Sequence, residues 1–134
     1  MASRSRIRIV RETNAPLPQM SWESIFYSAQ KVLRKKLLPL VVIFVSDRRS
    51  RELNARYRRK STPTNVLTFS QDRELVIAPM VVRTEAKTFG FSCKYWMTCL
   101  IVHGIVHLEG HNHATAKRRR AMESIERKIL DALE

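Results

Sequence analysis

Residues 103–113 read HGIVHLEGHNH and contain all four histidines of the 134-residue chain. The segment before them, Cys93 to Val102, is largely apolar and lacks Gly and Pro, which predicts a buried helix that carries the first two histidines. On that helix His103 and His107 are four residues apart, so both imidazoles leave one face in adjacent turns. This stretch therefore decides both the central helix of the fold and the chemistry that we expect on it.

Gly110 permits the left-handed backbone that ends a helix, after which the chain can turn and bring His113 back towards the first two histidines. Three neutral imidazoles, with nitrogen–metal distances of about 2.0–2.1 Å, make a tripod for Zn²⁺ that leaves one coordination position open. An open position is typical of a catalytic zinc site. The sequence thus predicts one Zn²⁺ per chain on His103, His107 and His113, with His111 left as a solvent-facing residue, a substrate contact or a competing ligand.

The charge balance predicts a polyanionic partner. The chain has 25 Lys and Arg against 12 Asp and Glu, a formal net charge of +13. Because these cations are spread over several segments rather than one amphipathic helix, we expect RNA or DNA and no membrane surface. No apolar run reaches the length of a membrane span, and no secretory signal is visible, so we expect a soluble, cytoplasmic protein.

The remaining sequence predicts an α+β fold in a single domain over residues 1–134, with one mixed sheet of about four strands, helices packed around it, and the metal site on the long penultimate helix. The first expected elements are a strand at Arg6–Arg11 with Ile7 and Ile9 inward, a helix from Ser21 to about Lys36, and a strand at Leu40–Val45 buried on both faces. A helix from Ser46–Asp47 with Leu53 and Tyr57 inward follows, and then strands at Val66–Phe69 and Leu75–Ala78. The chain ends with a helix from Pro79 to about Phe89, the histidine helix capped by Ser92, and a last helix from Thr115 with Met122, Ile125, Ile129 and Leu133 inward.

Two basic clusters are candidate RNA contacts. One lies around the end of the second predicted helix, and the other opens the last helix; their members are Arg56, Arg59, Lys60, Lys117, Arg118, Arg119 and Arg120. A structural reason suffices for some of the first cluster, because cations stabilise the C-terminal end of a helix dipole. Cys93 and Cys99 form no C-x-x-C pair, so we expect them to be buried apolar side chains of a reducing compartment.

Two stretches resemble the YbeY family of bacterial endoribonucleases, which act in ribosomal RNA maturation. The first, Leu53 to Phe69, contains the pairs Leu-Asn, Tyr-Arg, Pro-Thr and Val-Leu of the family's first motif, and the second is the histidine stretch. The resemblance covers nearly the whole chain. It implies a zinc-dependent, single-strand-specific endoribonuclease with metal ligands His103, His107 and His113 and a catalytic arginine at Arg58. It also implies a role in 16S ribosomal RNA 3′-end maturation and ribosome quality control, with the small ribosomal subunit as partner.

The chain departs from the family's pattern beside the last histidine, where Tyr-Asp is usual and His111-Asn112 stands. The change from Asp to Asn removes a negative charge near the expected metal, which puts catalytic efficiency in doubt more than the fold. In the mechanism that we expect, the guanidinium of Arg58 holds the phosphate in its planar donor fork. The sequence leaves open whether a water molecule or the RNA 2′-OH attacks.

Two other functions compete with this reading. The spacing of the three histidines is that of the metzincin proteases, but these need Glu directly after the first His as general base, and Gly104 stands there. The second alternative is a non-enzymatic module that binds RNA or the ribosome and holds a structural metal, with His111 as a fourth ligand.

Overall fold

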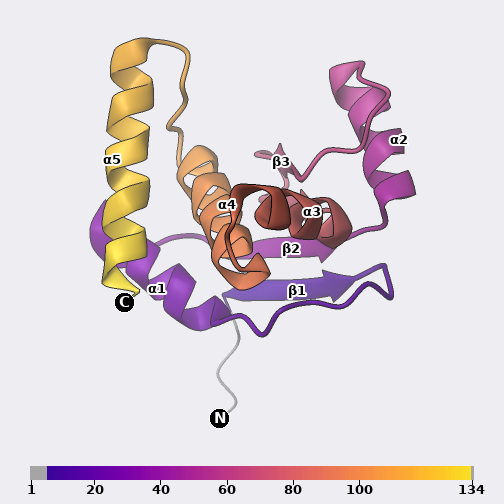
Figure 1. Cartoon of the computed structure of the whole chain (residues 1–134). Helices are drawn as coiled ribbons and strands as arrows, with labels where there is room; N and C mark the ends of the chain where they lie inside the picture. The colour runs from indigo at the N-terminus through magenta and orange to yellow at the C-terminus, as the bar shows by residue number, and fades with distance from the viewer. Residues whose placement is uncertain (1–5, 134) are drawn as a thin grey trace.

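The computed structural model describes residues 6–133; residues 1–5, part of the segment searched for a secretory signal, lie outside this range. The elements follow in the expected order, and Figure 1 shows them as β1 (Ile7–Arg11), α1 (Trp22–Leu33), β2 (Leu40–Phe44), α2 (Asp47–Arg58), β3 (Val66–Phe69), β4 (Glu74–Ile77), α3 (Pro79–Phe89), α4 (Cys93–Leu108) and α5 (Ala116–Ala132).

The four strands form one mixed sheet in the order β1-β2-β4-β3. β1 pairs with β2 and β2 with β4 in parallel, whereas β3 returns antiparallel to β4. Parallel neighbours need crossover connections, which α1 supplies between β1 and β2, and α2 with β3 between β2 and β4. The predicted α+β class with a single mixed sheet is confirmed.

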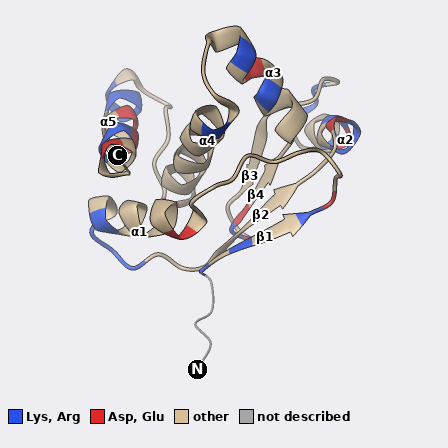
Figure 2. Cartoon of the chain, turned by 60° about the horizontal axis from the view of Figure 1, so that its bottom comes forward, with Lys and Arg blue, Asp and Glu red and all other residues tan. Residues whose placement is uncertain are grey.

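The two faces of the sheet are covered unequally. Helices α1, α3, α4 and α5 pack on one face and enclose the main core, whereas α2 covers part of the other face with Leu53. Figure 2 shows α2 alone on one side of the strands, with α1, α4 and α5 on the other. The expectation that the strand at Leu40–Val45 is buried on both faces is therefore wrong. In β2, Leu40, Val42 and Phe44 are buried, whereas Val41 and Ile43 on the α2 side are only partly covered.

Local hydrogen bonds account for most helix boundaries. Ser46, Ser92 and Thr115 cap α2, α4 and α5 as expected, because each hydroxyl accepts a hydrogen bond from the backbone N–H three residues later. Ser21 occupies the cap position of α1 but makes no such bond. α1 ends at Leu33, before the expected Lys36, because Arg34 adopts a left-handed backbone with φ 55°.

The cysteines and the apolar helices complete this part of the description. Cys93 and Cys99 are free thiols and only half-buried, rather than buried as expected, and partial burial raises the pKa of both. Within residues 6–133 no single helix is long and apolar enough to cross a membrane. α3 and α4 would pass only if taken together, and they are bent by 114° at the break between them.

Candidate metal centre and RNA-facing surface

Helix α4 presents its histidines to one side and its apolar residues to the sheet. Met97, Ile101 and Ile105 are fully buried, and Gly104 lies against β4. A Cβ atom at position 104 would stand 2.7 Å from Cδ2 of Leu75, so no side chain fits there without displacing Leu75. This close packing explains why glycine follows His103, and it fixes α4 on the sheet.

The structure brings three histidine rings together at the C-terminal end of α4. The ring centroids of His103 and His113 are 5.7 Å apart, those of His107 and His113 are 6.3 Å apart, and those of His103 and His107 are 6.5 Å apart. Gly110, at φ 96°, provides the left-handed turn that returns the chain. His103 and His107 are half-buried and His113 is exposed, so the group of rings is open to solvent on the His113 side.

Both helical imidazoles are oriented through Nδ1. His103 Nδ1 lies 2.6 Å from Oε2 of Glu126 on α5, and His107 Nδ1 lies 3.0 Å from the carbonyl oxygen of His111. A carbonyl oxygen only accepts, so His107 must donate from Nδ1, and an ionised Glu126 asks the same of His103. These tautomers leave the lone pair on Nε2, the arrangement found in metal-ligating histidines supported by a carboxylate or a carbonyl.

The donor chemistry of the three histidines fits a zinc ion, but their side chains stand slightly apart. Imidazoles that share one zinc at about 2.0–2.1 Å would have ring centroids about 5 Å apart, so the three rings would need to close by roughly an ångström. Accordingly, no group of three or more His, Cys, Asp or Glu side chains within the described residues holds its donor atoms in metal-binding positions as it stands.

His111 and Asn112 have other contacts. His111 lines a hollow of about 330 Å³ together with Arg118 and Ala121, and none of the other three histidines lines it. Asn112 Oδ1 accepts a hydrogen bond from the backbone N–H of Ala114, 3.0 Å away. Asp forms the same turn, so Asn at this position preserves the loop that carries His113.

The Glu109 side chain, close to the histidines in sequence, lies in an ion cluster. Its carboxylate lies 2.7 Å from Nζ of Lys35 and 2.8 Å from a guanidinium nitrogen of Arg73, and only 7% of the side chain is exposed. Burial acts to raise the pKa of Glu109, but hydrogen bonds from Lys35 and Arg73 outweigh it and lower that pKa below its ordinary value. The cluster ties the end of α4 to the segment that follows α1 and to the β3–β4 turn.

The first motif stretch is a loop tethered to α2. Ser50 Oγ donates to the carbonyl of Thr64 at 2.7 Å and accepts from the N–H of Thr64 at 2.9 Å. Asn54 Nδ2 donates to the carbonyl of Thr62 at 2.8 Å. Ser50 and Asn54 are both 2% exposed, so these buried bonds fix the loop between α2 and β3.

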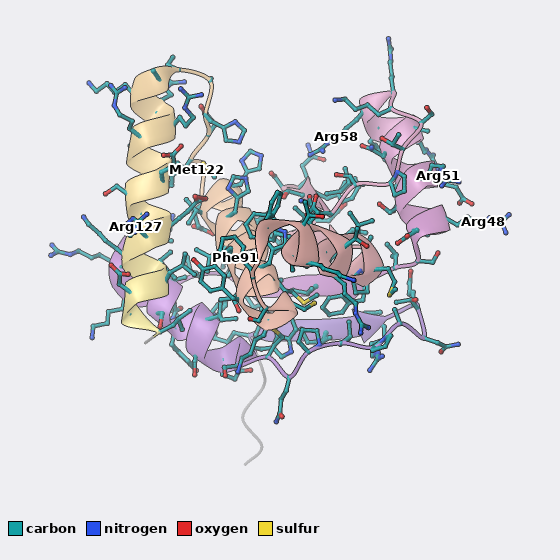
Figure 3. All side chains as sticks on the ribbon, in the orientation of Figure 1. Arg48, Arg51, Arg58, Phe91, Met122 and Arg127 are labelled. Carbon is teal, nitrogen blue, oxygen red and sulfur yellow. The ribbon has the colours of Figure 1, made fainter. Side chains whose placement is uncertain are left out.

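The structure corrects the expected environment of Arg58. Tyr57 was expected in the core, but it is 56% exposed and packs edge-on against Phe69, with ring centroids 5.1 Å apart. α2 covers only part of this face of the sheet, and its buried residues end at Asn54, before Tyr57. Arg58 is exposed in the last turn, and Figure 3 shows its side chain directed to the side where α4 lies, whereas Arg48 and Arg51 point outward.

Both basic clusters are exposed, and their helix ends lie on one side of the molecule. Figure 1 shows the end of α2, the end of α4 and the start of α5 at the same side of the fold. The side chains involved are Arg56, Arg59 and Lys60 at the first place and Lys117, Arg118, Arg119 and Arg120 at the last. Arg56 is partly engaged, because its guanidinium lies 5.5 Å from the ring centroid of Tyr57.

Sequence reasoning missed Glu126. The residue lies four positions after Met122, which is buried on the inner face of α5, so helical periodicity alone places Glu126 close to that face. An acidic residue next to a buried stripe, in a chain of net charge +13, was a usable signal for a partner of a histidine.

Comparisons with known proteins agree on one family. The family model described as endoribonuclease YbeY matches residues 11–134. The protein called endoribonuclease YbeY in Polynucleobacter asymbioticus is 32% identical over 145 residues, which cover 99% of this chain and 94% of the relative. The protein of the same name in Chelativorans sp. is 40% identical over 106 residues, and here the match covers 70% of this chain and 65% of the relative, slightly under two thirds of its length.

A solved structure supports the fold. The solution structure of TM1509 from Thermotoga maritima superimposes with a TM-score of 0.62 at 23% sequence identity. The match covers 95% of this chain and 88% of that one. At this identity the likeness concerns the arrangement of helices and strands.

Proposed function

The chain belongs to the endoribonuclease YbeY family, and from that membership we propose that it is a zinc-dependent, single-strand-specific endoribonuclease, a hydrolase of RNA phosphodiester bonds. Its proposed substrate is ribosomal RNA of the small subunit in the cytoplasm, at the 16S 3′ end and in ribosome quality control. The observation that carries the proposal is the grouping of three histidine rings, two of them held through Nδ1, beside exposed basic helix ends.

His103, His107 and His113 are the residues that would hold the metal. When bound, the metal supplies Lewis acidity towards a phosphoryl oxygen and lowers the pKa of water. Glu126 and the His111 carbonyl keep two of the imidazoles in one tautomer and one orientation, so that Nε2 of each keeps its lone pair available for a metal. The exposed His113 side leaves room for an RNA strand to approach.

Arg58 is the proposed phosphate contact. Its guanidinium presents two parallel N–H donors that match two oxygens of a phosphate, and a permanently charged donor stabilises negative charge that builds up during cleavage. The tethers from Ser50 and Asn54 to the following loop hold the end of α2 that carries Arg58. This rigidity supports a positioned contact rather than a mobile surface charge.

The two competing functions have less support. A protease of the metzincin kind needs a general base after the first histidine, and position 104 is packed against Leu75 with no space for a side chain. A purely structural metal would be closed by a fourth protein ligand, and His111, the candidate for it, lines a hollow whose lining includes none of the three grouped histidines. The endoribonuclease is therefore the function that the geometry favours.

The experiment is metal analysis of the purified chain combined with a cleavage assay on single-stranded ribosomal RNA. We expect one Zn²⁺ per chain, lost in His103→Ala and in His107→Ala, and retained in the control His111→Ala. Cleavage by the wild type should disappear when its metal is removed with a chelator and return when zinc is added back. Full zinc occupancy in either of the first two variants would refute the tripod, and zinc binding without RNA cleavage would favour the non-enzymatic module.

A further inference from the structure

An exposed aromatic cluster lies at the corner between α3 and α4. Phe89, Phe91 and Tyr95 are 53%, 43% and 46% exposed, although apolar rings of this size are usually covered. The half-buried ring of Trp96 lies beside them. It stacks on Phe91 with ring centroids 5.8 Å apart and packs edge-to-face with Phe89 with centroids 5.2 Å apart. Phe91 and Tyr95 are 5.0 Å apart.

Hydrogen bonds anchor Trp96, the ring on which the cluster packs. Trp96 Nε1 donates to Oε1 of Glu85 at 2.9 Å, and the same oxygen accepts from Nδ2 of Asn65 at 3.0 Å. Gly90 ends α3 with φ 77°, which turns the chain so that Phe89 and Phe91 flank the corner. Phe89 and Phe91 therefore pack against a ring that the protein itself anchors.

The fully exposed charges on the two helices of the corner are positive. Arg83, Lys87 and Lys94 are exposed on the two helices that form the corner, and Figure 2 shows these positive segments on α3 and α4. None of the three makes an ion pair with a carboxylate of the described residues. The acidic residue closest in the chain, Glu85, is occupied by Trp96 and Asn65.

We propose that Phe89, Phe91 and Tyr95 form a stacking surface on which unpaired bases of single-stranded RNA rest, while Lys87 and Lys94 contact the adjoining phosphates. Aromatic rings beside cations are the recurring way in which proteins bind single strands without reading their sequence. A second copy of the chain would bring the same positive charges face to face, and a basic partner would be repelled. Charge complementarity thus selects a polyanion with flat apolar faces.

The assignment of single-stranded RNA to this surface rests on the proposed function. The position of the surface on the same helix as the histidines agrees with it. Tyr95 and His103 are eight residues apart on α4, about 12 Å along its axis. Tyr95 and Lys94 also line a groove of about 920 Å³ between α4 and α5 that extends to Glu126, the partner of His103. The groove itself carries equal numbers of basic and acidic side chains, so the phosphate attraction resides at the corner.

The test measures binding of a short fluorescein-labelled oligouridylate to the full chain in the presence of EDTA, which prevents cutting. Phe91→Ala and Tyr95→Ala should each weaken binding about tenfold, whereas Tyr95→Phe keeps the ring and should bind like the wild type. Tyr27→Ala is the matched control, because Tyr27 is 55% exposed on α1, away from the corner. Affinity for a duplex RNA of the same length should not change in any of these variants.

The cations should behave differently from the rings. Lys87→Ala and Lys94→Ala should each make the plot of log affinity against log salt less steep, by the amount expected for about one lost phosphate contact. Phe91→Ala should leave the slope unchanged. If Phe91→Ala disturbs folding, Phe91→Leu keeps an apolar contact with Trp96 without a ring and should show the same loss of single-strand binding. Thermal melts of each variant separate the two effects.

Three results would overturn the proposal. Wild-type affinity for the oligouridylate in Phe91→Ala and Tyr95→Ala would do so, as would an equal loss of duplex binding. A wild-type dimer in sedimentation that Phe91→Ala dissociates, with RNA affinity unchanged, would identify the corner as a self-association surface instead. A chain that binds the oligouridylate through these rings but never cleaves RNA with zinc would leave the stacking surface standing and refute only the endoribonuclease.

Discussion

Arg58, in the first motif stretch, is the proposed phosphate contact. It extends from the last turn of α2 to the side where α4 lies (Figure 3). We predict that Arg58→Ala lowers the rate of RNA cleavage by about 10²–10³, because a donor acting on the transition state is lost. Zinc content and melting temperature should stay as in the wild type, since the side chain is exposed.

Arg56→Ala is the matched control for Arg58. Arg56 lies one position before Tyr57 and contacts its ring, so its guanidinium is already engaged within α2. Arg58→Lys should restore little activity, because an ammonium cannot present two parallel donors to a phosphate. Equal losses of activity in Arg56→Ala and Arg58→Ala would show that both act only as general positive charge.

Glu126 acts through His103 and is a positioning residue. We predict that Glu126→Gln weakens zinc binding about 10- to 100-fold, because an amide holds the imidazole tautomer less firmly than a carboxylate does. Glu123→Gln is the control: Glu123 lies one turn earlier on α5 and lines the α4–α5 groove. Competition with a chelating dye measures the zinc affinity of each variant. Equal affinity in the wild type and Glu126→Gln would show that Glu126 does not position His103 for the metal.

At the scale of residues, the sequence predicted what depends on short separations. The i,i+4 histidines, the Gly110 turn and three of the four predicted serine and threonine caps follow from local backbone rules. The bond from His103 to Glu126 spans 23 positions and depends on how α5 docks, which no local rule contains. Tyr57 was misplaced for a related reason, because helical periodicity gives a face but not how far a sheet extends beneath it.

At the scale of elements, the crossing of α4 over β4 depends on Gly104. Alanine gains about 1 kcal/mol of helix propensity over glycine, but its Cβ would overlap Cδ2 of a fully buried Leu75, and overpacking typically costs about 1–3 kcal/mol. We therefore predict that Gly104→Ala lowers the free energy of unfolding by about 1 kcal/mol. Urea unfolding with the metal chelated provides the measurement.

Leu75 supplies the control for Gly104. Leu75→Ala removes the two Cδ atoms that a Cβ at position 104 would meet, so in that background the helix propensity should decide. Gly104→Ala should then be neutral or stabilising, although Leu75→Ala is itself destabilising by about 2–5 kcal/mol. A Gly104→Ala substitution that costs the same in both backgrounds would show that the contact with Leu75 is not the cause.

The order of helices and strands was predictable because each element has a clear period and clear ends. Alternation in β1, the Pro79 start of α3 and its Gly90 end are examples. The partial exposure of β2 on its second face was not predictable from its continuous apolar run, because that pattern does not say how many helices cover each face. The end of α1 at Arg34 was equally hidden, since arginine seldom adopts a left-handed backbone.

At the scale of the whole molecule, the net charge of +13 should dominate RNA binding. We predict a steep linear fall of log affinity with log salt, with a slope of about −0.7 for each phosphate contacted on a single strand. The double variant Arg118→Ala/Arg119→Ala should reduce the slope by up to about two contacts, whereas Arg51→Ala, on the outer side of α2 in Figure 3, should leave it unchanged. A flat salt dependence would contradict an electrostatic interface.

The bond between His103 and Glu126 can form only late in the synthesis of the chain, because Glu126 belongs to the last helix. Chains emerge from the N-terminal end first, and the sheet with α1 to α4 is complete before α5 has been translated. Until α5 docks, the imidazole of His103 lacks its carboxylate and is free to rotate. Under the proposed function, full zinc affinity therefore requires that α5 has docked as well as that the sheet and α4 have formed.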